Sequence, residues 1–150
     1  MPNVSERMAY ADSSLLLKLY LREPETPAAL AAMGRASGPV FFTELHRLEI
    51  VNAIRRNLAA KRIRRSQALK ALRTLRRDLR SGFYTLPPVD WPGVFRRAHR
   101  LSRRHAATLA VRSLDLLHVA LALEMSAGEF LSFDDRQGKT ATAEGLTVLP

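Results

Sequence analysis

The chain has 150 residues, 47% of them apolar, and a formal net charge of +10. This length is about that of one domain, so we predict a single domain over residues 1–150 with a substantial apolar core. The absence of cysteine excludes a disulfide scaffold, a thiolate zinc site and a cysteine nucleophile. No run approaches the roughly 18 apolar residues of a membrane span, and residues 1–7 have no signal-peptide core. We therefore expect a soluble, cytoplasmic protein that does not bind membranes.

The positive charge is concentrated in two segments. Eleven of the 24 Lys and Arg residues lie between Arg55 and Arg80, where Asp78 is the only acid, and five more lie between Arg96 and Arg104. Clustering of this kind favours a polyanionic partner, most plausibly nucleic acid, through neutralisation of phosphates. A solvated basic face without a partner is the alternative.

Apolar runs and turn residues predict the elements of the first half of the chain. Met8 to Ala11 is a short apolar run that ends at Asp12 and changes to helical spacing, which is typical of a strand, a turn and a helix. The further elements expected here are a helix over 28–35, a strand over 40–42, a helix after the N-cap Thr43, and a helix capped by Ser66 with Leu69, Leu72, Leu75 and Leu79 along one side.

The second half continues the alternation of strands and helices. We expect a weak strand over 83–86, a helix over 94–107 that the N-cap Asp90 precedes, a buried helix over 114–123, a strand over 129–133, a short helix over 139–144 and a closing strand over 146–149. This alternation predicts an α/β protein with three layers, α/β/α, and a mainly parallel central sheet.

Four carboxylates stand out against this framework. Asp12 follows the first strand, where it is also an ordinary helix N-cap. Glu49 lies inside a helix without a basic residue at i−4, i+3 or i+4, so we expect its partner to come from elsewhere in the fold. Asp115 is in the first turn of the buried helix, and Asp134 follows the strand over 129–133. Near Asp115, His118 is better explained as a packed, hydrogen-bonded core residue than as a ligand.

Carboxylates at strand ends and on helices are suitable ligands for Mg²⁺ or Mn²⁺, because these ions prefer hard oxygen donors and leave positions open for water and phosphate oxygens. Such an ion can activate water and offset charge on a phosphodiester. The chain has no HExxH, GxxxxGK[ST] or GxSxG motif and no Cys/His zinc spacing. Metalloprotease, P-loop and serine-hydrolase functions therefore lack their signatures.

Over nearly its whole length, the chain resembles the PIN-domain ribonucleases and, among them, the VapC-like toxins of toxin–antitoxin pairs. The resemblance rests on the order and spacing of four segments: 10–20 (YADSSLLLKLY), 48–53 (LEIVNA), 112–120 (RSLDLLHVA) and 130–137 (FLSFDDRQ), with Glu144-Gly145-Leu146 near the end. It implies a PIN-like α/β/α fold and endonucleolytic cleavage of RNA by a metal-activated water.

The resemblance also implies the roles of particular residues. Asp12, Glu49, Asp115 and Asp134 would be the catalytic acids and the ligands of Mg²⁺ or Mn²⁺, with Ser14 and Ser132 supporting them; the position of Ser132 favours Asp134 over Asp135. The family's toxins are usually homodimers that a cognate antitoxin inhibits. We expect an amphipathic antitoxin segment to lie in an apolar groove between the helices that carry Ile50, Ile54, Leu58 and Leu69.

Two other functions stay open from the sequence. A non-catalytic nucleic-acid-binding module would account for the basic helices but not for Glu49 and Asp115. A receiver-like phosphoacceptor domain also carries acids at strand ends, but it needs an acidic pair after the first strand, where this chain has Asp12-Ser13.

Overall fold

The computed structural model describes residues 8–150, so the stretch 1–7, in which we expect no signal peptide, lies outside the described residues. A parallel five-stranded sheet with the order β3-β2-β1-β4-β5 forms its centre. The strands are β1 (Ala9–Ala11), β2 (Val40–Phe41), β3 (Tyr84–Thr85), β4 (Glu129–Leu131) and β5 (Thr147–Leu149). The predicted α/β class and parallel sheet are confirmed.

Helices connect the strands in every case. They are α1 (Ser13–Leu17), α2 (Thr26–Arg35), α3 (Glu44–Ala59), α4 (Arg65–Ser81), α5 (Trp91–Leu101), the π-helical segment η1 (Ser102–Ala106), α6 (Ala107–Leu109), α7 (Ser113–Glu124) and α8 (Asp135–Ala143). Within the described part of the chain, no helix is long and apolar enough to cross a membrane.

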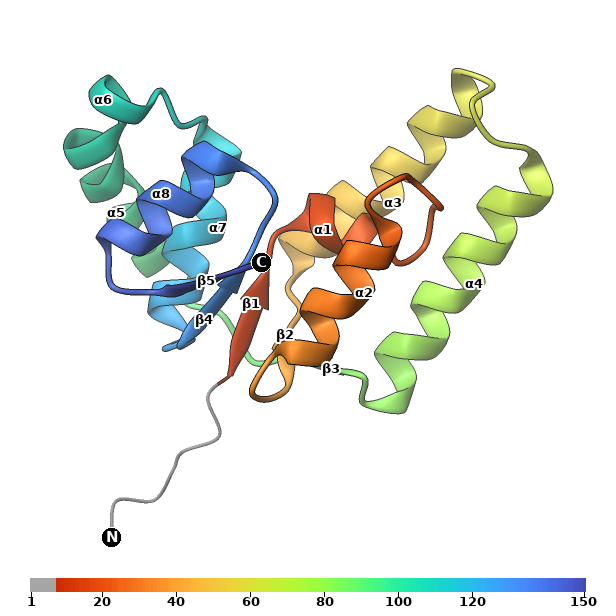
Figure 1. Ribbon diagram of the computed structural model, residues 1–150, viewed down its shortest axis with the longest axis horizontal. Helices are drawn as coiled ribbons and strands as arrows, with labels where there is room; N and C mark the ends of the chain where they lie inside the picture. Colours follow the sequence, from red (N-terminus) through yellow and green to blue (C-terminus); the bar gives the residue numbers. More distant parts are fainter. Residues whose placement is uncertain (1–7) are drawn as a thin grey trace, which may run out of the picture.

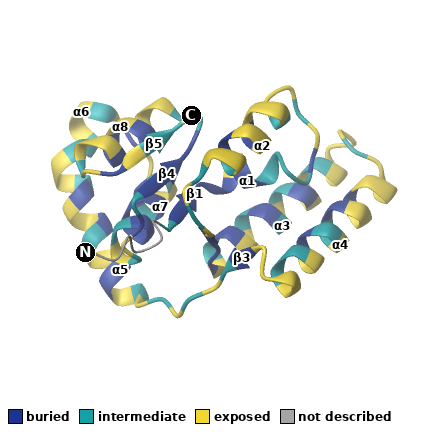
Figure 2. Cartoon of the chain, turned by 60° about the horizontal axis from the view of Figure 1, so that its bottom comes forward, coloured by how far each residue is buried: buried dark blue, intermediate teal, exposed yellow. Residues whose placement is uncertain are grey.

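The helices form two layers, one on each face of the sheet (Figure 1). Helices α1 to α4 pack over a core that includes Ala9, Ala11, Ile50 and Ile54. Helices α5, α7 and α8 pack over a second core, to which β1 contributes Tyr10. Alternate residues of β1 thus serve opposite faces, as the pleat of a strand requires, and the whole strand is buried (Figure 2).

The order of the strands creates a switch point between β1 and β4. The chain runs from β1 to β2 and β3 on one side, then crosses to β4 and β5 on the other. In open α/β sheets, ligands bind at the carboxyl ends of the two strands that flank such a point. Asp12 follows β1, and Ser132 follows β4 beside it, because Ala11 pairs with Leu131 and Asp12 N donates to Leu131 O at 3.0 Å.

Two predicted helix starts are wrong. Helix α4 begins at Arg65 rather than after Ser66, since Gln67 Oε1 accepts a hydrogen bond from Arg64 N at 2.7 Å and closes the first turn one residue earlier. Helix α8 begins at Asp135 rather than Lys139, because Asp134 caps it by accepting from Gln137 N at 2.8 Å.

The leucine stripe and the proposed antitoxin groove also need correction. On α4, Leu75 is buried with Ala68 and Ala71, whereas Leu69 is 46% exposed. Ile50 and Ile54 are fully buried in the core of α1 to α4. They cannot line an open groove, because α3 turns this apolar face toward the sheet.

The predicted N-cap Asp90 is confirmed, since the helix starts at Trp91 and the Asp90 side chain accepts from Gly93 N. The helix is less regular than expected: it changes to π-helical hydrogen bonding at Ser102 and ends at Ala110, which has a φ of 53°. The helix predicted to be buried all round, α7, exposes Leu114 at its first turn but buries the stretch 118–122 as expected.

Candidate active site

Asp12 is 1% exposed and receives hydrogen bonds on both carboxylate oxygens. Oδ1 accepts from Leu15 N at 2.7 Å, as an N-cap of α1, and from Ser14 Oγ at 3.1 Å. Oδ2 accepts from Ser132 Oγ at 2.5 Å. The capping role predicted as an alternative is therefore present, but a cap leaves Oδ2 without a partner, and Ser132 from the next strand supplies it.

Glu49 projects from α3 toward α1 and α7. Its Oε1 accepts from Ser13 Oγ at 3.0 Å and lies 2.6 Å from His118 Nε2. Burial raises the pKa of Glu49, but the hydrogen bond and charge of His118 and the hydrogen bond of Ser13 outweigh it and lower the net pKa. The prediction that a partner comes from elsewhere in the fold is confirmed.

His46, three residues before Glu49 on α3, turns the other way. Its Nε2 lies 2.8 Å from Ala11 O, and its Nδ1 accepts from Thr43 N at 2.9 Å. Burial, with the charge of His118 as a smaller cause, lowers the pKa of His46 to about 3, against the bond to Ala11. A neutral His46 thus closes the capping box of α3 and leaves Glu49 to His118.

His118 is 2% exposed and hydrogen-bonded, as the sequence predicts for a core histidine. Tyr10 Oη lies 2.6 Å from its Nδ1. The contact with Glu49 was missed: the two residues are 69 positions apart, and neither helix carries a local pattern that indicates the partner. Ser13 was missed as well, since its place in a helix start suggests only capping.

Asp134 and Asp115 meet through Gln137. Asp134 caps α8 by accepting from Gln137 N, and Asp134 N donates to Ser132 Oγ at 3.0 Å. Gln137 Nε2 donates to Asp115 Oδ1 at 3.0 Å. Burial, followed by the negative charge of Asp134, raises the pKa of Asp115, while Arg112 and His118 lower it less. Asp115 and Asp134 are therefore close enough to repel one another.

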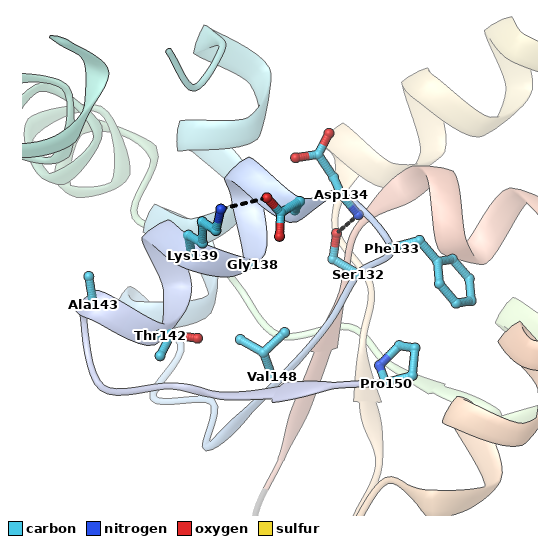
Figure 3. Close-up of a pocket in the computed structure, with 10 residues that line it drawn as sticks. Ser132, Phe133, Asp134, Gly138, Lys139, Thr142, Ala143, Val148 and Pro150 are labelled. Carbon is cyan, nitrogen blue, oxygen red and sulfur yellow. Dashed lines mark hydrogen bonds and ion pairs between the residues drawn. The ribbon is translucent and has the colours of Figure 1, made fainter. Parts of the chain in front are cut away.

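Asp135 faces away from this network. Its side chain is 79% exposed and pairs with Lys139 Nζ at 2.8 Å across one helical turn. In Figure 3 the carboxylate of Asp134 points away from Val148 and Pro150, which line a pocket between α8 and β5. Ser132, Asp134 and Asp135 also line this pocket, so it borders the network at the end of β4.

Three of the four predicted acids are joined by short bridges, and Glu49 contacts Ser13 and His118 beside them, although the four do not form a ready-made ligand cluster. Ser132 connects Asp12 with Asp134, and Gln137 connects Asp134 with Asp115. Across residues 8–150, no three His, Asp or Glu side chains already stand close enough to hold a metal ion. A divalent cation nevertheless fits the donor set, because every candidate ligand is a hard oxygen and the charge of Asp134 already acts on Asp115.

The two basic clusters differ in how many of their arginines are paired with acids. In the cluster from Arg96 to Arg104, three arginines are paired with acids: Arg96 with Asp90, Arg97 with Glu124 and Arg104 with Glu144. On α4, by contrast, Arg73, Arg76, Arg77 and Arg80 line a shallow exposed hollow, and Arg77 contacts Asp78 at 3.5 Å. This arginine face of α4 lies at the other end of the molecule from α8 (Figure 1).

Comparisons with known proteins agree with the geometry. The family model described as PIN domain matches residues 9–143. The chain is 30% identical over 142 residues to Ribonuclease VapC46 of Mycobacterium tuberculosis (strain ATCC 25618 / H37Rv), and the match covers 93% of this chain and 95% of that protein. The crystal structure of FitAcB from Neisseria gonorrhoeae matches with a TM-score of 0.59 at 13% identity, covering 95% of this chain and 97% of that chain.

The repulsion at Asp115 predicts a stabilising substitution. In the absence of divalent ions, Asp115→Asn should raise the melting temperature, because it removes a charge that the folded state disfavours and keeps an acceptor for Gln137. Added Mg²⁺ should then raise the melting temperature of the wild type more than that of the variant. Asp135→Asn, at an exposed position, is the matched control. A clear loss of stability for Asp115→Asn without metal would contradict the prediction.

Proposed function

Because the chain belongs to the PIN-domain family, we propose that it is a VapC-like toxin: a metal-dependent endoribonuclease that acts as one nuclease domain over residues 1–150. The observation that supports the proposal is the network at the switch point between β1 and β4, in which Ser132 and Gln137 join Asp12, Asp134 and Asp115. Ser13 and His118 tie Glu49 to the segments that carry Asp12 and Asp115. We place its action on RNA in the cytoplasm.

These four acids would hold Mg²⁺ or Mn²⁺. When bound, the ion supplies an activated water and offsets negative charge on the scissile phosphate. The residues contribute orientation. Ser14, Ser132 and the first turn of α1 fix the carboxylate of Asp12, and the first turn of α8 fixes that of Asp134 through Oδ1. Among the described residues, no hydrogen bond reaches Oδ2 of Asp134 or Oε2 of Glu49, so each acid keeps an oxygen for a cation.

RNA is the substrate that the charge supports. The arginine face of α4 is exposed and mostly unpaired, which suits the phosphate backbone of an RNA longer than the cleavage site. A non-catalytic binding module accounts for this face but gives no reason to retain Asp115 against the charge of Asp134. A receiver-like domain would need a second acid after β1, where this chain has Ser13, and it does not fit membership of the PIN-domain family.

An antitoxin would bind in a groove different from the one predicted from sequence. A cavity of about 680 Å³ lies between the segment after α1, helix α2 and helix α4. Its apolar lining includes Leu19, Leu21, Leu30 and Ile63, and its basic lining includes Lys18, Arg22, Arg62 and Lys70. We propose that an amphipathic antitoxin segment with acidic flanks occupies this α2–α4 groove.

We also propose that the toxin forms a homodimer. Leu48 on α3, Phe95 on α5 and Leu114 on α7 are each about half exposed or more. Large apolar side chains at the surface are typical of protein interfaces when they gather in one patch.

The neighbouring acids Asp134 and Asp135, which follow β4, provide a test of the proposed nuclease. Asp134→Asn and Asp12→Asn should each lower the rate of Mg²⁺-dependent RNA cleavage by more than the roughly 10- to 100-fold that loss of an outer partner of a metal site costs. Asp135→Asn should leave the rate nearly unchanged, because this residue pairs only with Lys139 across an exposed turn. Cleavage of a labelled RNA with and without chelator measures both. Full activity in Asp12→Asn, or the reverse ranking of the Asp134 and Asp135 variants, would contradict the assignment.

The α2–α4 groove can be tested in the inactive Asp12→Asn background, which spares the cells. Leu30→Asp places a charge on the apolar lining and should abolish co-purification of the antitoxin from the native host. Leu69→Asp, on an exposed position of α4 outside the lining, should retain it. Retention by Leu30→Asp together with loss by Leu69→Asp would contradict the proposal and place the partner on the exposed face of α4 that carries Leu69.

A further inference from the structure

We propose that His118, held by Tyr10, is a positioning residue that fixes the carboxylate of Glu49 for metal binding. This inference rests on the proposed function and extends it to two residues that do not touch the substrate. It concerns a chain of three hydrogen-bonded side chains, which we call the relay: Tyr10 and His118, which are buried, and Glu49, which is partly exposed.

The distances determine which atoms of the relay carry hydrogen. The carboxylate oxygen Oε1 of Glu49 is an acceptor, and it already takes the hydrogen bond of Ser13 Oγ at 3.0 Å. His118 Nε2, at 2.6 Å from Oε1, is therefore the donor. In a neutral ring this leaves Nδ1 as an acceptor, and Tyr10 Oη donates to it at 2.6 Å. A phenol carries its hydrogen at neutral pH, so Tyr10 Oη is the donor in this contact.

Ser13 joins the relay at its Glu49 end, since Ser13 Oγ donates to Glu49 Oε1 at 3.0 Å and lies 3.3 Å from His118 Nε2. His46 lies next to Tyr10, with ring centroids 4.8 Å apart, but its nitrogens are bound to Ala11 O and Thr43 N. On α7, His118 and Asp115 are the polar residues within an otherwise apolar stretch from Leu114 to Leu123. A buried, fully hydrogen-bonded histidine in this place holds one rotamer of Glu49 rather than contributing to the apolar core.

The consequence for Glu49 is a division between its two oxygens. Oε1 takes the hydrogen bonds from His118 and Ser13, which leaves Oε2 as the oxygen for a cation. Outer partners of this kind orient a metal ligand, and their loss typically costs about 10- to 100-fold in metal affinity or activity. Glu49 needs this support more than Asp12 or Asp134, because it lies within a helix and does not cap one.

The experiment measures Mn²⁺ binding to the whole chain without RNA, from the electron paramagnetic resonance signal of free Mn²⁺. His118→Ala should raise the Kd for Mn²⁺ by about 10- to 100-fold. His118→Gln, which can still donate to Oε1, should bind Mn²⁺ nearly as the wild type does. Tyr10→Phe should raise the Kd by a smaller factor, because it removes the hydrogen bond to His118 Nδ1 but leaves the imidazole of His118 and the aromatic ring at position 10 in place.

Two pairs elsewhere in the chain provide matched controls. His105 Nε2 lies 2.8 Å from Glu144 Oε1, so His105→Ala removes a similar contact away from the four acids. Tyr20 Oη contacts Asp78 and Tyr84, so Tyr20→Phe removes a hydroxyl that is partly buried. Neither control should change the Kd for Mn²⁺.

The outcomes separate positioning from simple stability. In RNA cleavage, His118→Ala should need more Mg²⁺ but recover most of its maximal rate at saturating Mg²⁺. A wild-type Kd in folded His118→Ala, or no rescue by His118→Gln, would overturn the proposal. If His118→Ala does not fold, equal Kd values for Mn²⁺ in Tyr10→Phe and Tyr20→Phe would overturn the proposal. Absence of Mn²⁺ binding and of metal-dependent cleavage in the wild type would instead contradict the proposed function itself.

Discussion

The candidate active site depends on one constraint, a buried carboxylate at the end of β1. Asp12 is almost inaccessible to water, so its ionised form needs donors from the protein. The first turn of α1 supplies two and Ser132 supplies the third. The third donor exists only because β4 pairs with β1 in register. The parallel sheet, the crossover from β3 to β4 and the helix start after β1 therefore have to form together.

The other three acids are held in place by different contacts. Asp134 gains from the first turn of α8, where the helix dipole favours a negative charge. Glu49 depends on His118 and Ser13. Asp115 has Gln137 as its donor and still has a raised pKa, so the fold retains a charge that it does not favour. Such retention is typical of a site that a cation completes.

The sequence predicts the parts of this arrangement that are local. The strand, turn and helix around Asp12 follow from hydrophobic spacing, and Ser132 indicates Asp134 rather than Asp135 only through family resemblance. Contacts between distant segments were not predicted, as His118 and Glu49 show, because periodicity defines the face of a helix and not the residue opposite. The apolar groove expected around Ile50 and Ile54 does not form for the same reason: these residues are apolar in the sequence whether they face a partner or the core, and here they face the core.

The most direct test of a cation site at the switch point is the anomalous diffraction of crystals grown with Mn²⁺. The account predicts a manganese peak within about 2–2.5 Å of oxygens from Asp12 and at least one of Glu49, Asp115 and Asp134. Manganese bound only at exposed acids such as Asp135, with none beside Asp12 at saturating concentration, would contradict it.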